Sequence, residues 1–130
     1  MRRRAVLAAL FTLPLGACTY VMDLTVTGDP AKPTFKFLKS GFDHKPLPYI
    51  NYLDIREAHR GELMWAIASK QGVHINAVSI RYGDVPENAE EYRRPLAIKQ
   101  NIVYEASSLG GFGYIGGTNF LIRDGRILLI

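Results

Sequence analysis

Apolar and polar residues alternate with a period of two in several short runs after residue 33. Such alternation places apolar side chains on one face of an extended segment and polar side chains on the other. β-Branched and aromatic residues dominate these runs, and turn-forming residues separate them, as is typical of strands. The alternating runs are 34–38, 53–56, 78–82 and 102–106, and a further run, 62–68, is apolar on both faces. Within 62–68 the large residues Leu63, Trp65 and Ile67 share one face, which directs Trp65 toward a core.

The end of the chain carries the strongest local signal. Residues 119–123 and 126–130 are two apolar runs separated by Asp124-Gly125. Asp-Gly is a preferred two-residue hairpin turn, because its backbone twist matches that of the strands it joins. Together with the alternating runs, this hairpin predicts an all-β domain, built as a small antiparallel two-layer sandwich.

The N-terminus has a different composition. Three arginines at 2–4 precede an uncharged segment over 5–15, which has the length of a signal peptide and is too short to anchor a helix across a bilayer. The segment ends in Leu15-Gly16-Ala17-Cys18. This order resembles the bacterial lipoprotein precursors, whose lipobox places leucine three residues before a cysteine and small residues directly before it. An ordinary secretory signal and a buried N-terminal helix are the alternatives.

The resemblance implies that Cys18 carries a diacylglyceryl group and that signal peptidase II recognises Leu15, Gly16 and Ala17 and cuts before the cysteine. Cys18 is the single cysteine of the chain, so no intramolecular disulfide can form. Acylation accounts for a lone cysteine in an exported protein. In a Gram-negative host, Thr19 after the cysteine implies the outer membrane, facing the periplasm, because aspartate at that position commonly retains such proteins in the inner membrane.

Three segments follow from this assignment. Residues 1–17 are a cleaved signal peptide, residues 18–32 a lipidated N-terminus and tether with a short first strand at 20–27, and residues 33–130 the sandwich domain. The arginines at 2–4 leave with the signal, which lowers the net charge from +4 to +1. A chain so close to neutrality has no basic stripe for nucleic acid, and its length suits one domain with a single core.

Within the domain, Trp65 stands in a central predicted strand, and Tyr104 precedes a glycine-rich loop and a closing strand. This order resembles the fibronectin type III and immunoglobulin-like sandwiches, in which a leucine six residues before a corner tyrosine is matched here by Ile98. Gln100 and Asn101 stand where those domains usually have proline and glycine. The resemblance implies a sandwich of that kind.

The segment 109–117, LGGFGYIGG, contains a literal G-x-G-x-x-G. A dinucleotide-binding loop opens a helix that holds the phosphates, and an acidic residue follows about 20 positions later on a second strand. After Gly116 the sequence predicts only two strands and a turn, so the match is accidental and no dinucleotide is expected. The segment is either a strand connection folded onto the core edge or a contact loop in which Phe112 and Tyr114 touch a partner.

Residues 87–94, ENAEEYRR, are rich in charge. They are either a solvated loop, with one helical turn over 86–92, or part of a partner surface. In the second interpretation the contacts come from Tyr92, Arg93 and Arg94, because tyrosine and arginine are favoured at interaction hot spots.

No motif for catalysis or metal binding stands out in the sequence. The histidines are spread over three predicted loops without ligand spacing. The carboxylates form no pair on one predicted face, and the serines lie in no Gly-x-Ser-x-Gly elbow. These residues are His44, His59, His74, Asp43, Asp54, Glu57, Glu62, Asp84, Ser40, Ser69, Ser79, Ser107 and Ser108. We therefore expect no catalytic residue, no metal and no cofactor.

The sequence thus predicts a membrane-anchored extracytoplasmic lipoprotein that acts as a non-catalytic interaction module of the cell envelope. Its expected partners are the membrane, through lipid on Cys18, and an envelope protein or a glycan. The alternative is a small-ligand or glycan binder, or a hydrolase, with a pocket at the end of the sandwich.

Overall fold

The structure, a computed structural model, describes residues 20–40, 45–47 and 49–130. Strands and turns make up most of this part, and its one helical segment is the 3₁₀ turn Gly111–Gly113. The predicted all-β class is confirmed. The strands are β1 (Tyr20–Asp29), β2 (Lys32–Lys39), β3 (Tyr49–Glu57), β4 (Leu63–Ser69), β5 (Ile75–Asn76), β6 (Ser79–Arg81), β7 (Ala89–Arg93), β8 (Val103–Gly110), β9 (Tyr114–Arg123) and β10 (Arg126–Leu129).

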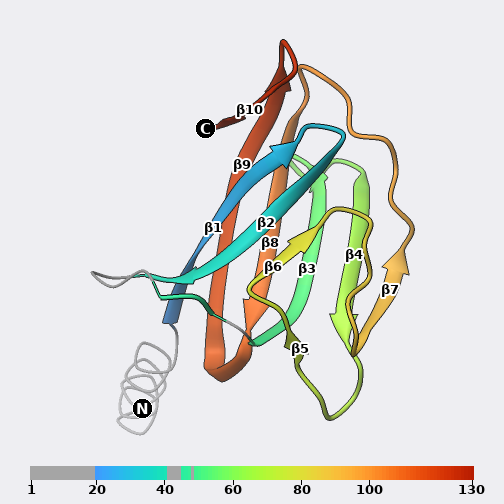
Figure 1. Cartoon of the computed structure of the whole chain (residues 1–130). Helices are drawn as coiled ribbons and strands as arrows, with labels where there is room; N and C mark the ends of the chain where they lie inside the picture. The colour runs from blue at the N-terminus through green and yellow to red at the C-terminus, as the bar shows by residue number, and fades with distance from the viewer. Residues whose placement is uncertain (1–19, 41–44, 48) are drawn as a thin grey trace, which may run out of the picture.

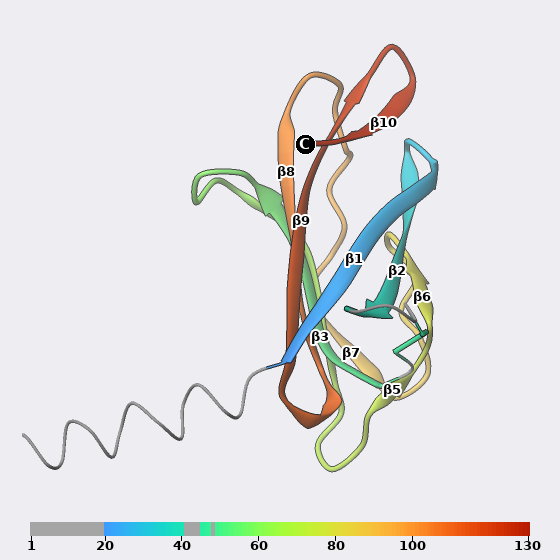
Figure 2. The same cartoon turned by 90° about the vertical axis from the view of Figure 1, so that its left-hand side faces the viewer.

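These strands belong to one continuous sheet. Its order is β6-β2-β1-β9-β8-β3-β4-β7, while β10 also pairs with β9 and β5 with β3. Neighbouring strands are antiparallel except β1 and β9, which run parallel where Tyr20 pairs with Tyr114 and Val21 with Ile115. The sheet curls, so that β1, β2 and β6 lie over β9, β8 and β3 (Figure 1 and Figure 2). The all-β chain thus forms a single curled mixed sheet, and the parallel β1–β9 pair departs from the fully antiparallel arrangement that the sequence predicts.

The core lies between the two parts of the curled sheet. Phe35 of β2 meets Phe120 of β9 edge-on at 5.9 Å between ring centroids, and Phe120 lies 5.6 Å from Tyr104 of β8. Trp65 of β4 is fully buried and its ring lies 5.3 Å from Tyr82, which follows β6. The prediction that Trp65 faces the core is confirmed. Aromatic contacts of this kind join the two layers over a large buried area.

β1 belongs to the sheet rather than to a tether. Met22, Leu24 and Val26 alternate with more exposed residues and are buried in the core. From Met22 to its end, β1 pairs with β2. Alternate burial needs a second layer, which β1 finds in β9 and β8. The short first strand expected at 20–27 is therefore present as the longer β1, and its apolar residues join the core.

A strand occupies the charged segment near residue 90. β7 pairs antiparallel with β4 at the edge of the sheet. Asn88, directly before β7, has a φ of +67°, which the small polar side chain of asparagine tolerates better than most. This turn lets the chain enter the sheet, so the helical turn expected at 86–92 is wrong.

Two local predictions can be compared directly with the structure. The hairpin at Asp124-Gly125 is confirmed, because β9 and β10 pair antiparallel and the two turn residues have φ of +52° and +70°. The Tyr104 hydroxyl accepts a 2.8 Å hydrogen bond from the Lys99 N–H. A corner tyrosine makes this kind of link to nearby backbone in immunoglobulin-like domains, although assignment to that superfamily stays a prediction.

Candidate functional site

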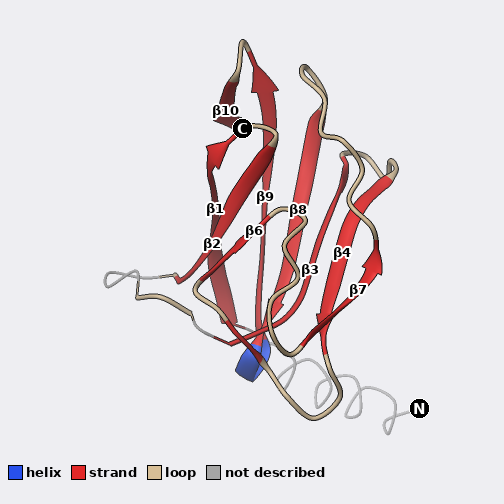
Figure 3. Cartoon of the chain, turned by 45° about the vertical axis from the view of Figure 1, so that its right-hand side comes forward, coloured by secondary structure: helices blue, strands red, loops and turns tan. Residues whose placement is uncertain are grey.

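The glycine-rich segment 109–117 joins β8 to β9 at one end of the sheet. β8 ends at Gly110, Gly111–Gly113 form the short 3₁₀ turn (Figure 3, blue), and β9 starts at Tyr114. Gly113 has a φ of +80°, which glycine adopts without strain. The two strands pair antiparallel. The segment is thus the predicted strand connection, whereas a dinucleotide loop leads from a strand into a helix.

Two of these glycines allow other side chains and strands to come close, which the sequence did not reveal. A Cβ on Gly116 would lie 2.4 Å from the Cγ and 2.5 Å from the carbonyl oxygen of Met22. A Cβ on Gly110 would lie 2.8 Å from Cδ2 of Leu47 and 2.9 Å from Cε of Met22. Carbon atoms pack at about 3.5–4.0 Å. Glycine is therefore required at Gly116, where the backbone of β1 is in the way, whereas a Cβ at Gly110 would displace the ends of two side chains.

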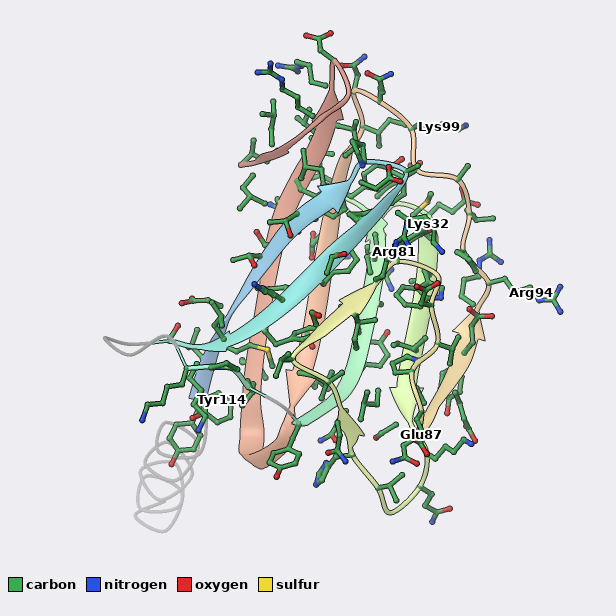
Figure 4. All side chains as sticks on the ribbon, viewed as in Figure 1. Lys32, Arg81, Glu87, Arg94, Lys99 and Tyr114 are labelled. Atoms are coloured by element: carbon green, nitrogen blue, oxygen red, sulfur yellow. The ribbon has the colours of Figure 1, made fainter. Side chains whose placement is uncertain are left out.

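Tyr114 lies at the start of β9, close to the start of β1 (Figure 4). Its ring packs on Tyr20 with 5.3 Å between ring centroids, and it is half-buried against the core. Packing on the core edge is what the strand-connection interpretation expects. The side chain of Phe112, the other expected contact residue of this segment, lies outside the described part of the chain.

An exposed apolar row crosses three strands beside this tyrosine pair. Val21, Ile115 and Leu109 are 57%, 44% and 48% exposed. Val21 pairs with Ile115 and Ile115 with Leu109, and paired residues point to the same face of a sheet. We define the anchor-end surface as Tyr20, Val21, Tyr49, Leu109, Tyr114 and Ile115, because Cys18 lies two positions before Tyr20 in the sequence.

The other expected contact residues lie elsewhere, in and after β7. Tyr92 is 66% exposed, and Arg93 lies 3.7 Å from the carboxylate of Glu62 in an ion pair. Arg94 projects outward on the side of the molecule opposite Tyr114 (Figure 4). The structure therefore separates Tyr114 from the expected contact residues in and after β7.

The outer face of β3 carries a polar cluster that the sequence did not identify as a site. Asp54 is 6% exposed. Its Oδ2 accepts a 2.6 Å hydrogen bond from the Tyr52 hydroxyl and lies 3.4 Å from the Arg56 guanidinium. Its Oδ1 is buried and has no hydrogen-bond partner among the described residues, an arrangement that is usually costly. The spacing of Tyr52, Asp54 and Arg56 at i, i+2 and i+4 is the sequence signal that could have placed these three side chains on one face of the strand.

The same cluster changes the acidity of its tyrosine. Burial raises the pKa of Tyr52 to about 12, assisted by its hydrogen bond to the Asp54 carboxylate and by the negative charge of that group. The hydroxyl therefore stays protonated and continues to donate to Asp54 through the neutral pH range.

A hollow of about 530 Å³ adjoins this cluster on the outer face of β8 and β9. It is lined by Glu105, Ser107, Gly117, Thr118, Asn119 and Ile130. Ser107 pairs with Asp54 across β8 and β3, so the cluster lies one strand away from the hollow. Another hollow, of about 450 Å³, lies beside the β9–β10 turn and is lined by Arg123, Asp124, Arg126 and Leu128.

The histidines stand apart from one another. His59 lies in the β3–β4 turn with a φ of +61°. His74 Nδ1 lies 2.6 Å from Asn51 Oδ1, and the ring is 5.8 Å from that of Tyr49. His44 lies outside the described residues. Within residues 20–40, 45–47 and 49–130, no three His, Cys, Asp or Glu side chains gather in a way that could hold a metal ion.

No family model, curated protein or solved structure matches the chain. Leu15, Gly16, Ala17 and Cys18, on which the lipoprotein prediction depends, lie outside the described residues. In the part of the chain that the structure describes, no helix has the length and apolar character needed to cross a membrane. The features of this chain that bear on function are therefore its own N-terminal motif and the surfaces described above.

Proposed function

We propose that the protein is an extracytoplasmic lipoprotein, held at a membrane by lipid on Cys18, whose β domain is a non-catalytic interaction module of the cell envelope. The observation that carries the proposal is the position of the lipobox. Residues 15–18 end two positions before β1, which starts at Tyr20. A signal segment followed directly by a folded domain is the arrangement of an exported domain tethered at its N-terminus.

Composition supports this proposal. Cys18 is the single cysteine in the chain, so its role has to be that of a free thiol, an intermolecular disulfide or a modified group. A lipobox directly before it favours modification. The net charge of +1 after removal of the signal suits a domain whose membrane attachment comes from lipid rather than from a strongly basic surface.

The interaction role is supported by the edge of the sheet at β7. This strand ends the order of the sheet, and its outer edge offers backbone groups to a partner strand. Tyr92 is 66% exposed on it, next to Arg93 and Arg94. These residue types are enriched at interaction hot spots, which suits an envelope protein as the partner.

Lipidation is tested by metabolic labelling with a fatty acid. The wild type should be labelled, whereas Cys18→Ser should be unlabelled and should accumulate as the uncleaved precursor. Ser40→Ala is a matched control outside the lipobox and should be labelled and cleaved like the wild type. Labelling of Cys18→Ser, or normal cleavage of that variant, would show that the lipobox assignment is wrong.

The membrane of residence is tested in a Gram-negative host. Thr19 after the modified cysteine leads us to expect the outer membrane, facing the periplasm. Density-gradient separation of the two membranes should place the wild type in the outer fraction and Thr19→Asp in the inner fraction. A wild type found mainly in the inner membrane contradicts the assignment.

A second candidate function is a small-ligand or glycan binder. The buried Oδ1 of Asp54, which has no partner among the described residues, favours it, together with the adjoining hollow. A chitin disaccharide, followed by the amide NMR spectrum, is a suitable probe. Binding should shift Ser107, Gly117 and Asn119 selectively, and an unchanged spectrum at millimolar sugar counts against a glycan at this site.

A further inference from the structure

The start of β1 leaves little room between the domain and its lipid. Cys18 lies two residues before Tyr20, and an extended chain spans at most about 3.3–3.6 Å per residue. Lipid on Cys18 therefore places the start of β1 within roughly 7 Å of the attachment point. Whatever surface surrounds Tyr20 faces the bilayer at close range.

That surface is apolar. The large apolar side chains exposed in the described part of the chain include five at this end, namely Tyr20, Val21, Tyr49, Leu109 and Ile115. Val21, Ile115 and Leu109 form one lateral row through the pairing of β1, β9 and β8. A contiguous exposed row of this kind marks a binding surface more often than isolated apolar residues do.

Aromatic and basic residues border the row. The rings of Tyr20 and Tyr114 lie 5.3 Å apart, and tyrosine favours the boundary between headgroups and acyl chains, where the ring is covered and the hydroxyl stays wet. Lys39 is exposed at the end of β2 and pairs with Met22 near the start of β1. Lysine near a bilayer surface is attracted to anionic headgroups.

We infer that the anchor-end surface lies directly on the lipid bilayer, with Val21, Leu109 and Ile115 against the headgroup region. This inference rests on the proposed lipidation of Cys18 and specifies the orientation of the domain. The bilayer is favoured over a protein as the occupant because the row begins at Val21, three residues after Cys18 in the sequence, and a protein partner would have to enter between the domain and the membrane. In this orientation β1 and β9 rise from the bilayer, and the β9–β10 turn lies at the far end (Figure 2).

The test uses the full mature lipoprotein in vesicles of phosphatidylethanolamine and phosphatidylglycerol. The Cys18 sulfur carries lipid, so a cysteine introduced at Ile115 is the only free thiol and takes an environment-sensitive fluorophore. Leu128→Cys is the matched control, since Leu128 is 38% exposed against 44% for Ile115. Leu128 pairs with Leu121, six positions farther along β9, about 20 Å from the row.

Lipids with a nitroxide near the headgroup should quench the Ile115 fluorophore several-fold more strongly than the Leu128 fluorophore. Val21→Ser combined with Leu109→Ser should then reduce quenching at position 115 toward the control value, because the domain loses its apolar contact while the lipid tether is unchanged. Both side chains are about half exposed, so the melting temperature should stay the same.

The outcomes separate this inference from the proposed function. Protein that does not float with the vesicles refutes lipid anchoring and this orientation together. Protein that floats but shows equal quenching at the two positions overturns the orientation alone. Strong quenching at position 115 that persists in the Val21→Ser, Leu109→Ser variant shows proximity through the tether and overturns the apolar contact. If the Val21→Ser, Leu109→Ser variant has a lower melting temperature than the wild type, Leu109→Asn alone serves as the second variant. The comparison of quenching at positions 115 and 128 needs neither variant.

Discussion

Replacing Gly116 by alanine should destabilise the domain, although alanine normally favours folding over glycine. Met22 of β1 lies on Gly116 where β1 crosses β9. The added Cβ would lie 2.4 Å from the Met22 Cγ and 2.5 Å from its carbonyl oxygen. Because carbon atoms pack at about 3.5–4.0 Å, β1 must move by about 1 Å. Met22 is only 2% exposed, so this movement disturbs the core.

The size of the effect follows from this geometry. Overpacking a close-packed site costs about 1–3 kcal/mol. Gly116→Ala belongs at the upper end, because one of the clashing atoms is a backbone oxygen that no change of rotamer can remove. Alanine regains only about 0.4–1 kcal/mol through the entropy of the unfolded chain. A net loss of about 2 kcal/mol corresponds to roughly 8 °C in melting temperature for a domain of this size.

Thermal unfolding followed by far-ultraviolet circular dichroism measures this loss. Adding Met22→Ala to Gly116→Ala should not restore the melting temperature, since that change removes Cγ and leaves the carbonyl oxygen in place. Gly117→Ala is the matched control. Its Cβ would lie 3.0 Å from the nearest atom, the Ala106 carbonyl oxygen, so a smaller loss is expected. A wild-type melting temperature for Gly116→Ala, or a larger loss for Gly117→Ala, would refute the reasoning.

Two further predictions concern aromatic side chains. Trp65→Ala should cost about 3–5 kcal/mol of unfolding free energy because it empties a fully buried site. Trp65→Phe should cost less, although it loses the 2.9 Å hydrogen bond from Nε1 to Glu91. Melting curves identical to the wild type for both variants would contradict the burial of Trp65. Stability should also fall between pH 10 and about 12, because the unfolded tyrosines ionise there whereas Tyr52, with its pKa raised to about 12, stays neutral in the folded protein. Burial likewise raises the pKa of Tyr82 and Tyr104, which adds to this loss of stability. Denaturant titrations across this pH range measure the free energy of unfolding, and Tyr52→Phe should show a shallower decline than the wild type. A wild-type stability that does not change with pH in this range would refute the raised tyrosine pKa values.

Several of the strands could be predicted because their signals are local. Period-2 alternation and an Asp-Gly pair depend only on residues close together in the chain, so the run 34–38 and the hairpin at 124–125 could be placed without knowing the rest. β7 could not, because Ala89–Arg93 is mostly polar and becomes a strand only where β4 offers a free edge. Propensity and pattern leave such a segment undecided until its partner is known.

The sequence by itself determined the all-β class and the lipobox prediction, both of which depend on neighbouring residues. Only the tertiary structure decided the surfaces. Val21 and Ile115 are far apart in the chain and become neighbours because β1 runs parallel to β9, and the buried oxygen of Asp54 depends on what surrounds β3. The need for glycine at position 116 likewise arises only because β1 crosses the chain there. Such long-range pairings are stabilised by many weak contacts distributed over the whole core, and a short stretch of sequence does not determine them.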